Sequence, residues 1–263
     1  MDNLKPKRKR TRPRRDVALM VTCLADLMRP SVGFAAVRLL ERAGCRVTVP
    51  ERQTCCGQPA YNSGDVNAAV PVARAVIELF EPYDYVVAPS GSCAGMLCQH
   101  YPALFEGEWR ERALALAAKT WELTRFLTEV APLPAPKKPP LETTVTYHDG
   151  CAGLREMEVR QQPRQLLLQQ CGVEVRELSQ TEVCCGFGGT FCTKMPAIST
   201  KMADDKLDSA VASGAQLLLG GDLGCLLHIA GRARRRGLEL EVRHVAEILA
   251  GTPKGPGIGE PRG

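Results

Sequence analysis

The sequence predicts an α/β fold built from two similar halves, each with a parallel sheet. Three observations support this prediction. Apolar, β-branched stretches alternate with segments of helical spacing, one cysteine pattern occurs twice, and a proline-rich segment separates the two copies. The chain has 263 residues, of which 44% are hydrophobic and 24% charged. This composition is typical of a globular protein with a sizeable core and excludes a disordered or collagen-like chain.

The apolar periodicity indicates three strands and two helices in each half. In the first half we expect strands at 16–22, 46–49 and 85–88, and helices at 32–43 and 68–80. In the second half we expect strands at 143–147, 173–178 and 216–219, and helices at 156–170 and 198–212. Because strands and helices alternate, the two sheets should be parallel, Rossmann-like and buried on both faces.

The composition also predicts the domain organisation. We expect a first domain at 16–130, a proline-rich linker at 131–142 and a second domain at 143–250. The segments 1–15 and 251–263 are expected to be disordered tails. The first 15 residues carry eight basic groups and one acidic group, whereas the whole chain has a net charge of +5. The body of the protein is therefore nearly neutral.

The basic N-terminal run limits the partners that the sequence suggests. Clustered Lys and Arg can bind RNA or an anionic membrane surface, but we interpret residues 5–15 as a solvated tail. We expect no nucleic-acid partner, and contact with a membrane would be peripheral. No stretch approaches the roughly 20 apolar residues that span a bilayer, and no cleavage site follows the apolar stretch 17–21. We therefore expect a cytoplasmic protein.

The twelve cysteines are the strongest functional signal in the chain. A disulfide framework is typical of small secreted domains, so metal or redox chemistry is the better interpretation here. Eight of the cysteines form one pattern twice, with offsets of 128, 129, 129 and 132 between matching positions, and this indicates an internal duplication. The first set is Cys23, Cys55, Cys56 and Cys93, and the second is Cys151, Cys184, Cys185 and Cys225.

Each repeated cysteine follows the carboxyl end of a predicted strand, where parallel sheets bind ligands. Four thiols should therefore meet in each half. Structural zinc sites mostly arise from spaced Cys-x₂₋₄-Cys pairs, whereas an adjacent Cys-Cys pair suits a larger multi-iron centre. Gly57 and Gly186 let the backbone approach that centre. We predict two iron–sulfur clusters, one in each half, with a zinc-stabilised binding module as the alternative.

The two Cys…Cys-Cys-Gly…Cys arrays resemble the CCG (cysteine-rich) domain family, found in heterodisulfide reductase and in the iron–sulfur subunits of glycolate and lactate oxidation systems. The resemblance covers roughly residues 16–250 and is carried by the motifs at 21–24, 55–64, 89–93, 184–191, 194–196 and 224–226. It implies a duplicated α/β fold and two clusters held by the eight repeated cysteines. It also implies an electron-transfer, oxidoreductase subunit that acts with partner subunits in oxidising L-lactate to pyruvate.

One departure from the family pattern concerns the fifth cysteine of each array. The heterodisulfide type ends each array with Cys-x-x-Cys, whereas this chain has Met96 and His228 at the last position. Four thiolates in each half favour an ordinary [4Fe–4S] cubane and disfavour direct disulfide reduction. A heterodisulfide-reductase-like subunit and a glycolate oxidase iron–sulfur subunit remain the alternatives.

The remaining candidate residues have weaker patterns. Cys98 and His228 are both open as a fifth ligand, and we interpret His148 as a hydrogen-bond donor near the second site. Cys45 and Cys171 are expected in the core. The chain shows neither a catalytic nucleophile–base signature nor a nucleotide-binding glycine loop, so partners should supply the lactate chemistry.

Overall fold

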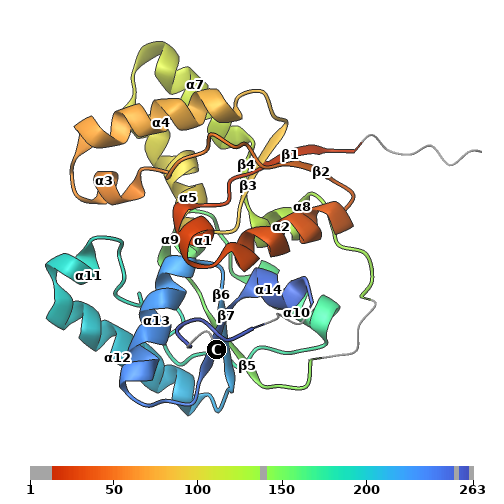
Figure 1. The fold of residues 1–263 in the computed structure, drawn as a ribbon, viewed down its shortest axis with the longest axis vertical. Helices are drawn as coiled ribbons and strands as arrows, with labels where there is room; N and C mark the ends of the chain where they lie inside the picture. The colour runs from red at the N-terminus through yellow and green to blue at the C-terminus, as the bar shows by residue number, and fades with distance from the viewer. Residues whose placement is uncertain (1–13, 137–140, 252–254, 261–263) are drawn as a thin grey trace, which may run out of the picture.

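A computed structural model describes residues 14–136, 141–251 and 255–260. It contains one parallel sheet in each half, as Figure 1 shows, and confirms the α/β fold of duplicated halves. The first sheet has the order β2-β1-β3-β4, with β1 (Asp16–Leu19), β2 (Arg46–Thr48), β3 (Tyr85–Ala88) and β4 (Thr120–Glu122). The second has the order β5-β6-β7, with β5 (Val145–His148), β6 (Leu217–Gly220) and β7 (Glu241–His244).

The helices of the two halves surround these sheets. Those of the first half are α1 (Cys23–Met28), α2 (Pro30–Arg42), α3 (Gln58–Asn62), α4 (Val66–Phe80), α5 (Gly91–Gly95), the π-helical turn η1 (Met96–His100), α6 (Tyr101–Leu104), α7 (Gly107–Ala118) and α8 (Leu123–Glu129). Those of the second half are α9 (Cys151–Arg155), α10 (Gln161–Cys171), α11 (Phe191–Lys194), α12 (Pro196–Ala212), α13 (Leu223–Arg235) and α14 (Val245–Leu249).

Local sequence signals explain where the main helices begin. Pro30 opens α2, where its missing N–H removes no helical hydrogen bond. The carboxylate of Asp65 caps α4 by accepting a hydrogen bond of 3.0 Å from the backbone N–H of Ala68. Both signals stabilise the first turn of a helix that the sequence periodicity predicts.

A hydrophobic core shared by the two halves lies between their sheets. Helices α2 and α8 pack against α10 and α14 between the two sheets, and this layer crosses the middle of Figure 1. Buried side chains from both halves meet there, including Leu39, Phe126, Leu167 and Val245. Polar contacts add to the packing, since the guanidinium of Arg29 pairs with the carboxylate of Glu247 at 3.0 Å. The cysteine-bearing edges of both sheets are therefore held in a fixed relation.

Two of the predicted elements are wrong in the second half. The strand expected at 173–178 is reduced to one bridge between Val145 and Val175. The N–H of Arg176 still donates to the carbonyl of Val145 at 2.8 Å, and the N–H of Ser179 then donates to the hydroxyl of Ser209 on α12 at 2.9 Å. The helix expected at 156–170 begins only at Gln161. Pro163 fits the first turn of that helix but would break its interior.

The predicted tails and linker fall partly outside the described residues. This applies to 1–13 of the basic tail, 137–140 of the linker, and 252–254 and 261–263 of the C-terminal tail. The described part of the C-terminal tail is packed, in contrast to the loose tail expected there. Ile258 is buried, and its N–H donates to the carbonyl of Val242 at 2.8 Å. The side chain of Ile258 thus anchors this segment, although its glycines and prolines are typical of an unstructured tail.

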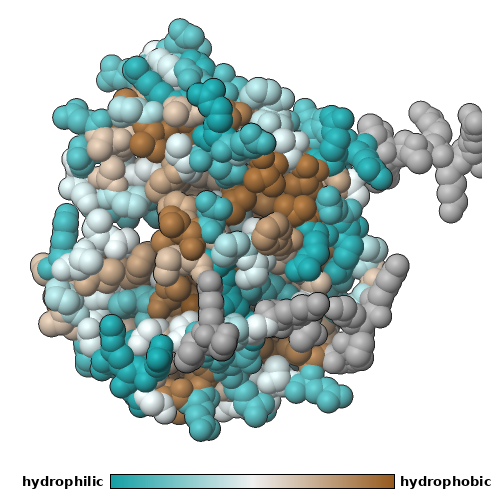
Figure 2. Space-filling model, in the orientation of Figure 1, coloured by the Kyte–Doolittle hydropathy of each residue, from teal (hydrophilic) through white to brown (hydrophobic). Residues whose placement is uncertain are grey.

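The surface carries some apolar side chains. Leu27 on α1 and Phe34 on α2 are 75% and 69% exposed, and Figure 2 shows hydrophobic residues in the region of these two helices. Among the described residues, no helix combines the length and the apolar character that crossing a membrane requires.

Candidate metal centres

The first cysteine group gathers at the carboxyl edge of the first sheet. Cys23 begins α1 after β1, Cys55 and Cys56 lie in the loop before α3, and Cys93 lies in α5 after β3. The Sγ atoms of Cys23 and Cys55 are 3.5 Å apart, as are those of Cys56 and Cys93. A hydrogen bond between Cys55 and Cys56 joins the two pairs. The structure thus brings four predicted residues from three segments together.

The second group repeats this arrangement. Cys151 begins α9 after β5, Cys184 and Cys185 lie in the loop before α11, and Cys225 lies in α13 after β6. Hydrogen bonds link Cys151 to Cys184, Cys184 to Cys185, and Cys185 to Cys225. All eight thiols are free, as are the other four. The pairing order is the same in both halves, so the duplication extends to the side chains.

One thiol in each group is poised as a thiolate. The hydrogen bond from Cys23 is the main cause that holds the pKa of Cys55 well below its ordinary value of 9.0. The hydrogen bond from Cys151 does the same for the pKa of Cys184. The backbone N–H of Gly186 adds a contact of 3.4 Å to the Sγ of Cys184. Thiolates are the form of cysteine that binds metals.

The glycine after each Cys-Cys pair is required by the backbone. Gly57 and Gly186 have φ values of +80° and +88°, in the left-handed region that favours glycine. A Cβ at position 186 would also lie 2.7 Å from the carbonyl oxygen of Ser199. These glycines allow the loop to turn its N–H groups toward the thiols, as predicted from the sequence.

A cavity of about 730 Å³, which includes space open to solvent, lies against the first cysteine group. One wall is formed by the four thiols, and the other comes from the second half through Phe187, Thr190 and the start of α13. Asp222 spans the two walls, since its carboxylate accepts a hydrogen bond of 2.9 Å from the N–H of Ser92. The first group is thus reached through a cleft that both halves build.

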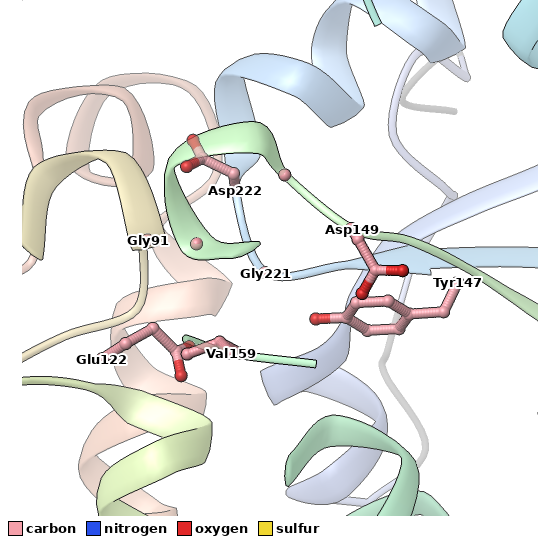
Figure 3. A pocket seen from close by; sticks show the side chains of 9 residues that line it. Gly91, Glu122, Tyr147, Asp149, Val159, Gly221 and Asp222 are labelled. Carbon is pink, nitrogen blue, oxygen red and sulfur yellow. The ribbon is translucent and has the colours of Figure 1, made fainter. Parts of the chain in front are cut away.

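A smaller cavity between the halves, of about 280 Å³ including space open to solvent, lies next to this contact. Figure 3 shows Glu122 from the first half and Tyr147 from the second approaching it from either side. Asp222 also lines it. Burial raises the pKa of Glu122 to about 7 and raises the pKa of Asp222 as well. The cavity is therefore lined by carboxyl groups that bind protons more readily than carboxyls in water.

We expect the Glu122→Gln variant to change how stability depends on pH. The folded-state pKa of Glu122, about 7, lies above its ordinary value of 4.5, so its stabilising contribution is complete below pH 4.5 and is lost as the pH rises toward 7. Between pH 5 and pH 8 the wild type should lose about 2 kcal/mol of unfolding free energy relative to the variant. Chemical denaturation across this pH range measures the difference.

The control in that experiment is the wild-type protein at each pH, because any general acid effect acts on both proteins alike. A free-energy difference between variant and wild type that stays constant from pH 5 to pH 8 would contradict the assignment.

The second cysteine group has two buried basic side chains beside it. His148 ends β5 and is 1% exposed, and burial lowers its pKa to about 3. Lys206 of α12 is also 1% exposed, and its ammonium donates to the carbonyl of Gln180. Position 206 lies on the helical face that buries Ala203 and Ala210, and this spacing could have marked Lys206 as buried.

The other candidate residues lie away from the thiol groups or have partners of their own. The Sγ of Cys98 faces the carbonyls of Ala117 and Thr120, 3.7 Å away from each. The Nε2 of His228 lies 3.2 Å from the hydroxyl of Ser199. Cys45 and Cys171 are buried in the shared core. Both Cys98 and His228 thus have contacts outside the two cysteine groups.

Comparison with known proteins places this duplicated arrangement in a family. The family model described as "CCG: Cysteine-rich domain" matches residues 17–98 and 145–230, which together hold all eight repeated cysteines. The chain belongs to the CCG cysteine-rich domain family. Each matched segment holds one group of four thiols and most of the strands of one sheet, whereas β4 and β7 lie outside the matched segments. The resemblance seen in the sequence is thus confirmed.

Relatives of this CCG protein share nearly its whole length. Lactate utilization protein A of Bacillus thuringiensis (strain Al Hakam) and that of Bacillus cereus (strain AH187) are each 47% identical to it over 235 residues. Those alignments cover 89% of this chain and 98% of each relative. A hypothetical protein from Helicobacter pylori has a similar fold, with a TM-score of 0.61 and 11% identity over 95% of this chain and 50% of its own.

The donor atoms present fit an iron–sulfur centre. Each group offers four thiols, one of them poised as a thiolate, together with a glycine loop whose N–H groups can bond to sulfur. The chemistry of this donor set suits soft, thiophilic metals and does not suit magnesium or calcium, which prefer oxygen ligands.

Proposed function

We propose that this chain is an iron–sulfur electron-transfer subunit that acts with partner subunits in oxidising L-lactate to pyruvate. The observation that carries the proposal is the pair of matching four-thiol groups, in a chain 47% identical to Lactate utilization protein A over 98% of that protein. The name of these relatives supports lactate utilization as the process, and the thiol groups support metal-based redox chemistry as the part that this chain plays.

The residues divide the work at each site. Cys23, Cys55, Cys56 and Cys93 would hold one [4Fe–4S] cluster, and Cys151, Cys184, Cys185 and Cys225 would hold the other. A cluster bound at each site would supply one-electron redox chemistry, so two sites match the two electrons released when lactate becomes pyruvate. The backbone around Gly57 and Gly186 would donate hydrogen bonds to sulfur, and burial of the second cysteine of each pair would exclude water.

Partner subunits and a reducing compartment belong to this proposal. The glycine loops serve the cysteine pairs and lack nucleotide-binding spacing, so hydride or substrate chemistry would come from another subunit. All twelve cysteines are free thiols, and this favours the cytoplasm as the location. The absence of a fifth cysteine in each array speaks against the heterodisulfide-reductase-like alternative.

Metal analysis of anaerobically purified protein tests the proposal. We expect about eight iron atoms and eight acid-labile sulfides per chain, as two [4Fe–4S] clusters require. EPR spectra of the reduced protein should show two signals. A colourless protein with stoichiometric zinc would overturn the proposal in favour of a zinc-stabilised module. Reduction of the clusters by L-lactate, but not by glycolate, when the partner subunits are added would identify the substrate.

A further inference from the structure

His148 is a buried imidazole with no hydrogen-bond partner in the described part of the chain. Its side chain is 1% exposed, and neither Nδ1 nor Nε2 bonds to another described group. Buried polar atoms are nearly always hydrogen-bonded, because leaving one unpaired costs its full desolvation free energy. The hydrogen-bond donor expected from the sequence therefore has no acceptor among these residues, and both ring nitrogens remain free to bind a ligand.

The position of His148 points to a metal as that ligand. A ring nitrogen of His148 and the Sγ atoms of Cys185 and Cys225 all lie within 4.8 Å of one another, and all three residues are buried. These donors come from β5, from the loop before α11 and from α13. Imidazole and thiolate are both good ligands for iron and zinc. These three donor atoms are close enough together to hold one metal ion.

The first half has no counterpart to this imidazole. Met20, Val21 and Thr22 precede Cys23, where His148 precedes Cys151, and none of them carries a ring nitrogen.

A second difference between the two sites concerns charge, and it appears when corresponding helices are aligned. The loop glycines Gly57 and Gly186 approach the carbonyls of Ala69 and Ser199, so the helices α4 and α12 correspond at an offset of 130 residues.

At that offset, the apolar side chain of Val76 in the first half corresponds to Lys206 in the second, and both are 1% exposed. Lys206 is close enough to the second cysteine group to interact electrostatically with Cys184, Cys185 and Cys225. The second site thus has a buried cation, Lys206, and an unbonded imidazole, His148, and the first site has neither at the corresponding positions.

We propose that His148 is a ligand of the second metal centre in place of one of the four thiolates assigned above, so that this centre has a mixed imidazole and thiolate donor set, while the first centre is bound by thiolates alone. The proposal rests on the proposed function for the identity of the centre as iron–sulfur. An imidazole brings less negative charge to iron than a thiolate and raises the reduction potential. His148 and Lys206 would both stabilise the reduced state of the second centre, so its reduction potential is higher than that of the first. An electron shared between the two centres would therefore reside mainly on the second.

Pulsed EPR on the wild-type protein tests the ligand directly, without a variant that could fail to fold. Reduced protein is prepared anaerobically with natural-abundance histidine and with ¹⁵N-labelled histidine. We expect one of the two cluster signals to show a strong nitrogen hyperfine coupling that changes with the label. Only the weak couplings typical of nearby hydrogen-bond donors, in both signals, would overturn the proposal.

Two variants test the consequence for potential. His148→Cys keeps a metal-binding side chain but supplies a thiolate, so the potential of one centre should shift downward and the labelled coupling should vanish. His228→Gln is the matched control, because that ring is bonded to Ser199, and both potentials and the coupling should stay unchanged. An unchanged potential in His148→Cys would contradict the proposal. A protein without iron and sulfide would instead overturn the proposed function itself, so the two failures are distinguishable.

Discussion

Replacing Cys55 with serine is expected to remove the metal of the first centre and leave the second intact. The Sγ of Cys55 lies 3.5 Å from that of Cys23 and is also bonded to Cys56, so it links the members of its group. A serine hydroxyl is a poor ligand for soft metals. Iron and sulfide should fall to about half of the wild-type content, with one EPR signal lost, as expected when one of two clusters is missing.

The matched control is Cys45→Ser, since Cys45 is buried in the shared core at 4% exposure and is not part of either group. This change should retain both EPR signals and the full iron content, although it places a hydroxyl among apolar side chains and lowers stability by about 1–3 kcal/mol. Equal loss of iron from the two variants would refute the assignment of the ligands. Loss of both EPR signals from Cys55→Ser alone would show that the two centres form as one unit.

The two cysteine groups could be predicted from the sequence because their pattern occurs in both halves. The spacing around Cys23 and Cys151 appears in both halves, so neither copy had to be interpreted alone. The alternation of strands and helices then predicted that each set lies at the carboxyl edge of its own parallel sheet, because the carboxyl ends of parallel strands lie on the same side. The two groups of thiols follow from these two facts and from no detail of packing.

Other features were missed because their signal depends on contacts distant in the sequence. The stretch 173–178 looks like a strand, but it forms only one bridge to β5, and the N–H of Ser179 directly after it bonds to Ser209 of α12. Asp222 looks like an ordinary helix cap, yet its carboxylate binds the N–H of Ser92 in the other half. His148 and Lys206 distinguish the second site only when each is compared with its position in the first half.

The close contact between α5 and α9 predicts that replacing Gly91 with alanine strongly lowers the stability of the protein. A Cβ at this position would lie 2.5 Å from the Cα of Gly153 and 2.8 Å from its backbone N. Neither backbone atom can rotate away, so α5 and α9 must separate. These helices carry Cys93 and Cys151, and the change would therefore move one thiol of each group. We expect Gly91→Ala to lower the unfolding free energy by about 1–3 kcal/mol, the usual cost of overpacking.

Gly231→Ala provides a control of the opposite sign. Gly231 lies within α13, and a Cβ there would meet no atom within 4 Å. Alanine is the better helix former, so this variant should gain up to about 1 kcal/mol. Denaturant titration of the two variants, with EPR of the reduced proteins, tests the reasoning, because both changes add the same methyl group. If Gly91→Ala were as stable as the wild type and gave the same EPR spectra, α5 and α9 would have to lie farther apart, and the close packing of the two thiol-bearing helices would be wrong.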